Sequence, residues 1–126
     1  MNFNKAQLGA IEHKDGAMLV LAGPGSGKTA VITHRTKNLI TKHHVKPSEI
    51  LVITFTKAAA NEMKERFNSL MKDERVNVSF GTFHAVFFTI LKYAYRFTSA
   101  NIADESVRYG FIREILSYYR LEYKDE

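Results

Sequence analysis

One stretch of the sequence combines glycines, a lysine and a threonine at a spacing suited to binding phosphate. It matches the P-loop pattern, except that alanine replaces glycine at the first position, and it consists of Ala22, Gly23, Pro24, Gly25, Ser26, Gly27, Lys28 and Thr29. Glycines let the backbone bend around phosphate oxygens without Cβ clashes, so that several N–H groups can converge on the anion. Lys28 would reach the β- and γ-phosphates, and the Thr29 hydroxyl would ligate Mg²⁺. The segment therefore predicts a nucleotide site.

Two elements must position this loop. The run from Ala17 to Ala22 (AMLVLA) has the length and composition of a strand buried on both faces. A helix is expected to begin near Lys28, with an apolar stripe at Val31, Ile32, Leu39 and Ile40, and its N-terminus would point at the same anion. A glycine-rich turn with an exposed lysine is the alternative, and the flanking strand and helix argue against it. The loop alone does not separate a kinase, a GTPase and a motor ATPase.

The rest of the chain repeats the order of strand and helix. Ile50 to Phe55 (ILVITF) predicts a second buried strand, and Val76 to Phe80 (VNVSF) predicts a third. The helix between them is amphipathic, with its apolar face formed by Ala60, Met63, Phe67, Leu70 and Met71. A helix over about 83–95 is apolar nearly all round and is expected to be buried, and a last amphipathic helix follows residues 101–105. Repeated units of this kind predict an α/β fold with a parallel sheet in three layers.

Composition narrows the class of protein. The 126 residues suit one domain, and the absence of cysteine excludes disulfides and thiolate metal sites. No apolar run approaches the roughly 18 residues of a membrane span, and the N-terminus lacks the apolar core of a secretory signal, so we expect a cytoplasmic protein without membrane contact. The net charge of +5 favours a polyanionic partner only weakly, because acids and bases alternate along the chain.

Three further segments carry motifs: FNKAQ at residues 3–7, TFTKAAANEMKER at 54–66 and GTFHA at 81–85. Together with the P-loop, in order and spacing, they resemble the superfamily 1 DNA helicases of the UvrD, Rep and PcrA kind, over nearly the whole chain. The resemblance implies a three-layer P-loop NTPase fold of the RecA-like type with a parallel sheet, incomplete in this chain, and ATP and Mg²⁺ as cofactors. Residues 1–126 would form the N-terminal, ATP-binding part of the first motor domain, ending near the start of an inserted helical subdomain.

The resemblance also implies how the base is bound. Gln7 matches the family's adenine-reading glutamine, and a glutamine amide can pair with both N6 and N7 of adenine. Without the family match, Gln7 would be an ordinary surface amide. The residue after Thr29 is often arginine in close relatives and is Ala30 here, so that adenine selectivity would depend more on Gln7.

The same resemblance implies contacts with single-stranded DNA. Phe55 would stack on a base, His84 would contact a phosphate or base, and the remaining contacts to the DNA backbone would come from Thr54, Thr56, Lys57 and Thr82. Taken alone, Phe55 would be a core strand residue and His84 a satisfied structural group. His13, His34, His43 and His44 match no motif, and we expect the adjacent pair to be exposed to solvent instead of binding a metal.

Some parts of a complete motor are not found in the sequence. No apolar strand carrying a Walker B acidic pair follows Phe80, and Asp104 and Glu105 are interpreted as helix-start charges favoured by the helix dipole. An arginine finger, worth about 10³- to 10⁵-fold in turnover, would lie in a second motor domain. We therefore expect weak nucleotide binding and negligible hydrolysis. The resemblance also implies that the P-loop strand is flanked by strands encoded later in the family's sequences, so we expect unpaired sheet edges and self-association through them.

Several functions are compatible with these motifs. The leading hypothesis is the ATP-binding portion of an ATP-dependent 3′-to-5′ DNA helicase or translocase. The alternatives are the motor portion of a helicase–nuclease subunit, a small P-loop kinase, and a stand-alone nucleotide- or DNA-binding module without a motor. The long match at 54–66 argues against a kinase, in which nothing requires that segment at the end of a strand.

Overall fold

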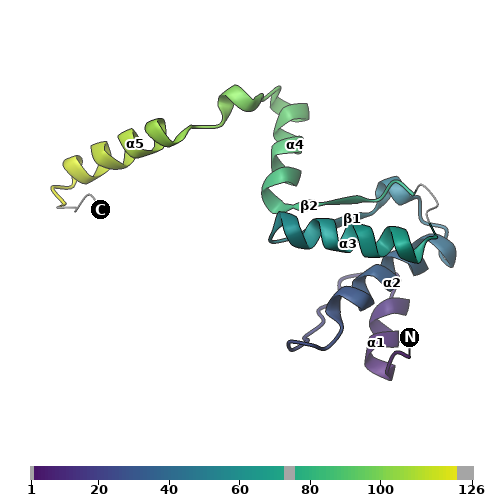
Figure 1. The fold of residues 1–126 in the computed structure, drawn as a ribbon. Coiled ribbons are helices and arrows are strands. Elements are labelled where there is room, and N and C mark those ends of the chain that lie inside the picture. Colours follow the sequence, from purple (N-terminus) through teal and green to yellow (C-terminus); the bar gives the residue numbers. More distant parts are fainter. Residues whose placement is uncertain (1, 73–75, 122–126) are drawn as a thin grey trace. The chain divides into compact units, whose positions relative to one another are not determined.

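The computed structural model describes residues 2–72 and 76–121, and it divides the chain into two compact units, Met1–Val86 and Phe87–Glu126. The elements of the first unit appear in Figure 1, from purple to green along the chain. They are α1 (Lys5–Glu12), α2 (Lys28–Thr41), the 3₁₀ helix η1 (Pro47–Glu49), β1 (Leu51–Thr54), α3 (Lys57–Leu70), β2 (Ser79–Thr82) and the start of α4 (Phe83–Tyr95).

The sheet of the first unit consists of β1 and β2. The two strands are parallel, with Leu51 opposite Ser79 and Thr54 opposite Thr82, and α3 connects them as a crossover helix. The second predicted strand and the helix after it are therefore confirmed. The third predicted strand is shifted, since it runs from residue 79 to 82 instead of from 76 to 80. Val76 and Val78 pack into the core ahead of the ladder, which begins where Ser79 pairs with Leu51.

The core of the first unit lies between α3 and the sheet. Phe67 is fully buried, and its ring lies 5.6 Å from that of Phe80, measured between centroids. Ile50, Met71 and Val78 complete the buried cluster, as the apolar face predicted for α3 requires. In Figure 1, α3 runs along the two strands and α1 lies beside α2. Burial of this face holds β1, β2 and α3 together.

The strand predicted over residues 17–22 is wrong. These residues form neither helix nor strand, and Leu19 and Leu21 are 84% and 88% exposed. A strand requires a partner for its N–H and C=O groups, and within residues 2–72 and 76–121 the only paired strands are β1 and β2. The P-loop is therefore preceded by an exposed apolar segment that pairs with no strand in the described ranges.

The second unit contains the rest of α4, the 3₁₀ helix η2 (Ser99–Asn101) and α5 (Glu105–Tyr118). The predicted bounds of α4 are confirmed, but its predicted burial is wrong, because none of its residues is buried. Ile90 and Tyr93 are among its exposed apolar side chains, at 52% and 87%. The assignment of Asp104 to a helix start is confirmed, since its carboxylate accepts the N–H of Val107 and caps α5.

Candidate functional site

The P-loop is a closed turn that leads directly into α2. Gly25 and Gly27 have φ angles of 72° and 80°, a left-handed conformation in which a side chain would be strained. The Ser26 hydroxyl donates to the carbonyl of Gly23 at 2.7 Å, and its backbone N–H donates to the same oxygen at 3.4 Å. The two glycines therefore account for the shape of the loop, which α2 follows at Lys28 as the sequence predicts.

Lys28 folds back over this turn. Its Nζ atom donates to the carbonyls of Gly23 at 2.7 Å and Ala22 at 3.3 Å. The first turn of α2 contains Lys28 and the half-buried Thr29, and Gly27 at the N-cap provides no side chain to accept its N–H groups. An ammonium group and the positive end of a helix thus lie together, an arrangement that suits a phosphate group.

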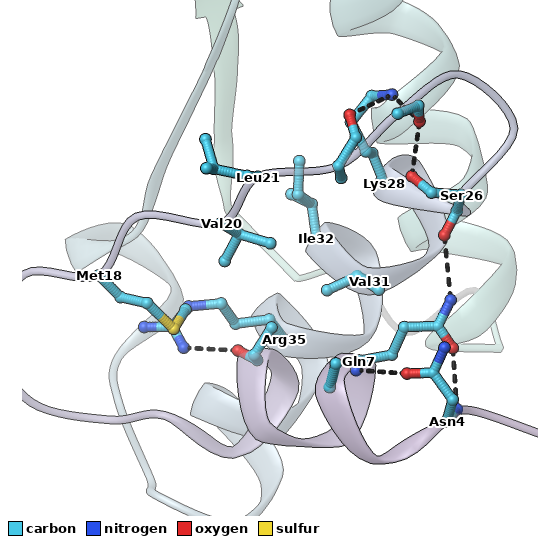
Figure 2. Close-up of a pocket in the computed structure, with 14 residues that line it drawn as sticks. Asn4, Gln7, Met18, Val20, Leu21, Ser26, Lys28, Val31, Ile32 and Arg35 are labelled. Carbon is cyan, nitrogen blue, oxygen red and sulfur yellow. Dashed lines mark hydrogen bonds between the residues drawn. The ribbon is translucent and has the colours of Figure 1, made fainter.

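Gln7 lies against the loop although it is 19 residues away in the sequence. Its Oε1 accepts the N–H of Asn4 at 2.9 Å, while Asn4 Oδ1 accepts the N–H of Gln7 at 2.9 Å, forming a capping box at the start of α1. Its Nε2 donates to the carbonyl of Ser26 at 3.0 Å. Figure 2 shows these bonds linking α1 to the loop. The folded chain therefore brings Gln7 to the P-loop.

A pocket of about 440 Å³ opens between α1, the segment before the loop, and α2. This volume is within the range of small-ligand sites. Its wall is mostly apolar and includes Met18, Val20 and Ile32, as Figure 2 shows. Lys28 and Arg35 are the charged residues of the lining, and no acid is among the described residues that form it, so the pocket favours an anionic ligand.

The sequence predicts an apolar stripe on α2 that includes Val31 and Ile32, and its pattern does not single out Arg35. In the structure all three residues line the pocket. Arg35 donates through Nη1 to the carbonyls of Ala10 and His13, which holds the C-terminal end of α1 against α2. The spacing of residues 28, 31, 32 and 35 is a helical face that begins at the P-loop lysine, and this signal could have identified the pocket wall.

The residues predicted to contact DNA lie at the edge of the sheet where both strands have their carboxyl ends. Because Thr54 and Thr82 are in register at the carboxyl ends of parallel strands, the segments that follow them emerge side by side. Phe55 is 87% exposed, so it is not part of the core. Lys57 and His84 are exposed as well, in the first turns of α3 and α4.

The threonines at this edge differ in exposure and in hydrogen bonding. Thr56 Oγ1 accepts the N–H of Ala59, and Thr82 Oγ1 accepts the N–H of Ala85, both at 3.2 Å. Each hydroxyl acts as an acceptor in these bonds, so its own proton can be donated outward. Thr54 differs from expectation, because it is buried and its hydroxyl donates to the carbonyl of Thr56 at 2.8 Å. Thr54 therefore shapes the turn before α3.

No cluster of three or more histidine, cysteine, aspartate or glutamate side chains able to hold a metal occurs within the described parts of the chain. The expected exposure of the adjacent pair, His43 and His44, holds for His44 only, since His43 is half-buried and its Nε2 has no hydrogen-bond partner among the described residues.

None of the helices in the described ranges is long and apolar enough to cross a membrane.

Comparison with known proteins identifies relatives over most of the chain. The chain is 51% identical over 81 residues to the ATP-dependent DNA helicase SRS2 of Saccharomyces cerevisiae, covering 62% of this chain and 7% of that protein. It is 45% identical over 89 residues to the ATP-dependent DNA helicase PcrA of Bacillus subtilis, covering 71% of this chain and 12% of that protein. For PcrA of Staphylococcus aureus the identity is 42% over 91 residues, covering 72% and 12%.

The chain thus spans about a tenth of the length of these curated relatives. A model of one family, the UvrD/REP helicase N-terminal domain, matches residues 3–124, which is nearly the whole sequence. The match includes the P-loop, Gln7 and both segments at the edge of the sheet. The α/β architecture with a parallel strand pair is compatible with it. The chain therefore belongs to the UvrD/REP helicase N-terminal domain family.

Proposed function

We propose that this chain is the ATP-binding portion of an ATP-dependent 3′-to-5′ DNA helicase of the cytoplasm. Residues 1–126 would form the N-terminal part of the first motor domain, with the RecA-like P-loop fold, ending near an inserted helical subdomain. The observation that carries the proposal is the convergence of Lys28, the start of α2 and Gln7 on a pocket with no acidic lining. The names of SRS2 and PcrA, both ATP-dependent DNA helicases, support the same conclusion.

In this proposal the P-loop residues hold ATP with Mg²⁺. Backbone N–H groups of residues 23–29 surround the phosphates, Lys28 exchanges its carbonyl partners for phosphate oxygens, and the Thr29 hydroxyl ligates the metal. A charged phosphate is a stronger partner for the ammonium than a carbonyl, so binding favours that exchange. Hydrolysis by this chain alone should be negligible, because no Walker B pair or arginine finger was found in its sequence.

Binding of a fluorescent ATP analogue with Mg²⁺ tests this site. Lys28→Ala should weaken binding by about tenfold or more, the loss expected when one charge-assisted contact of roughly 1.5–3 kcal/mol is removed. Thr29→Val should reduce only the part of the affinity that depends on Mg²⁺. Lys64→Ala removes an exposed lysine of α3 and serves as the matched control. Equal affinity for the unmodified chain and Lys28→Ala would refute the assignment.

We also propose that the edge formed by Phe55, Thr56, Lys57, Thr82 and His84 binds single-stranded DNA. Stacking of a base on Phe55 suits a partner of any sequence and is worth roughly 1–3 kcal/mol. Fluorescence anisotropy with a labelled oligothymidine should show a loss of about 5- to 150-fold for Phe55→Ala. Tyr93→Ala is the matched control, since Tyr93 is also 87% exposed. A similar loss for both variants would contradict this interface.

Self-association is expected from the free edges of the sheet. Within the described residues β1 and β2 pair only with each other, so the outer edge of each strand has unpaired backbone groups. The exposed apolar segment around Leu19 and Leu21 adds to this tendency. Size-exclusion chromatography with light scattering should show a mass that rises with concentration, whereas a constant monomer mass would exclude it.

A further inference from the structure

The side-chain amide of Gln7 has more hydrogen-bonding capacity than the structure uses. A glutamine amide offers two N–H donors and two acceptor positions on its oxygen. One donor is engaged by the Ser26 carbonyl at 3.0 Å, and one acceptor position is engaged by the Asn4 N–H at 2.9 Å. One donor and one acceptor position therefore stay available for a base, while the bond to the loop is kept.

The bond to Ser26 acts on the part of the loop that must hold phosphate. Ser26 lies between the two left-handed glycines, so its carbonyl sets the direction of the peptide that leads into Gly27. A Cβ atom built on Gly27 would lie 3.3 Å from Gln7 Nε2, which shows how closely the amide approaches this turn. Gln7 therefore restrains the loop at the point where α2 begins.

Gln7 can exert this restraint because α1 is itself anchored. Arg35 donates to the carbonyl of Ala10 at 2.9 Å, and Asn38 donates through Nδ2 to the carbonyl of Ile11 at 3.1 Å. Both side chains come from α2, the helix that follows the loop, and Ala10 and Ile11 are buried. The loop is thus held at its far end by α2 and along its side by a helix that α2 also fixes.

We propose that Gln7 is a positioning residue for phosphate: through the Ser26 carbonyl it holds the loop in its phosphate-binding shape, whether or not a base is present. This inference rests on the proposed nucleotide function of the same site. A glutamine that only reads adenine would contribute to the binding of ATP and would contribute nothing to the binding of a phosphate chain without a base.

The test compares ATP with inorganic tripolyphosphate, both with Mg²⁺, by NMR titration of the ¹⁵N-labelled 126-residue chain. Gln7→Ala should weaken the binding of both ligands by about 3- to 10-fold, the effect of one hydrogen bond. Gln7→Glu keeps the acceptor for Asn4 but removes the donor and adds a negative charge beside the loop, so it should weaken both at least as much. The resonances of Ser26 and Gly27 should shift in both variants before any ligand is added.

Gly9→Ala is the matched control on α1, since a Cβ at this position meets no atom within 4 Å. It should leave the affinity for both ligands within about twofold, and the spectra show directly whether each variant is folded. If Gln7→Ala weakens ATP binding alone, the inference is overturned and the nucleotide site stands. If the unmodified chain binds neither ligand, the proposed function and this inference fail together.

Discussion

Residues 50–82 and residues 87–121 are both rich in apolar side chains, yet they differ in what those side chains contact. In the first region Phe67 is fully buried between α3 and the two strands. In the second, none of the described residues is buried, and Tyr93 and Phe111 are 87% and 64% exposed. The two regions show that a periodic apolar pattern specifies the face of a helix, whereas burial of that face depends on a partner.

Among the substitutions that test this difference, Phe67→Ala is expected to lower the free energy of unfolding most. Removal of a fully buried aromatic side chain costs about 3–5 kcal/mol, which approaches the whole stability of a small domain. Urea unfolding followed by circular dichroism should show a corresponding loss of the free energy of unfolding. Phe111→Ala in α5 should change that free energy by less than about 0.5 kcal/mol. A comparable loss for both variants would mean that α5 is buried in solution.

A smaller effect is expected at the start of α3. Thr56 caps this helix by accepting the N–H of Ala59, and loss of such a cap typically costs about 1 kcal/mol. The midpoint of urea unfolding should therefore fall for Thr56→Ala. Thr41→Ala is the control, because this exposed hydroxyl only donates to the carbonyl of Lys37 within α2. An unchanged midpoint for Thr56→Ala would show that the core alone determines where α3 begins.

The second unit should respond to pH through its own helix cap. The pKa of Asp104 is lowered by the backbone N–H of Val107 and by the Ser106 hydroxyl. A lowered pKa in the folded state means that the carboxylate stabilises α5 above the ordinary value of 3.8, and that this contribution is lost as the pH falls through the folded pKa. The Cα chemical shifts of α5 should therefore lose helical character in acid.

Asp104→Asn separates this effect from general acid unfolding. Asparagine keeps an oxygen that can accept the Val107 N–H but does not titrate in this range. The loss of helical character in acid should then be smaller at the start of α5, because the charge of the cap no longer changes with pH. Identical acid profiles for Asp104→Asn and the unmodified chain would exclude the cap as the cause.

The smallest effect is expected in the apolar segment before the P-loop. Leu19 is 84% exposed, so Leu19→Ser should change the free energy of urea unfolding by less than about 0.5 kcal/mol. The same measurement on the unmodified chain provides the reference. A loss of several kcal/mol would show that residues 17–22 form a buried strand in solution after all.

Helix positions were predicted well from the sequence because their causes are local. The bounds of α4 agree with the prediction, and α2 begins at Lys28 after a glycine that adopts the left-handed conformation. Asp104 begins α5 as its position before an apolar stripe indicates. Capping, glycine conformation and a period of 3.6 residues all act within a few positions of one another.

Only one of two comparable apolar runs forms a strand, because a strand needs a second strand to pair with its backbone. The run at residues 50–55 contributes β1, which pairs with β2 more than 20 positions later, whereas the run at 17–22 pairs with no strand in the described ranges. The amino-acid composition of the two runs does not predict which of them becomes a strand. Hydrogen-bonding partners and a covering helix decide it, and both come from elsewhere in the chain.

The sequence by itself determined the family, the P-loop residues and the positions of α2, α3, α4 and α5, since each is expressed by neighbouring residues, whereas α1 was not predicted. Only the tertiary structure decided that the Gln7 amide reaches Ser26, that the Thr54 hydroxyl is used inside the protein, and that Arg35 joins the pocket wall. These facts follow from contacts between residues distant in sequence. Such contacts depend on how the elements pack, and a pattern within one element carries no information about them.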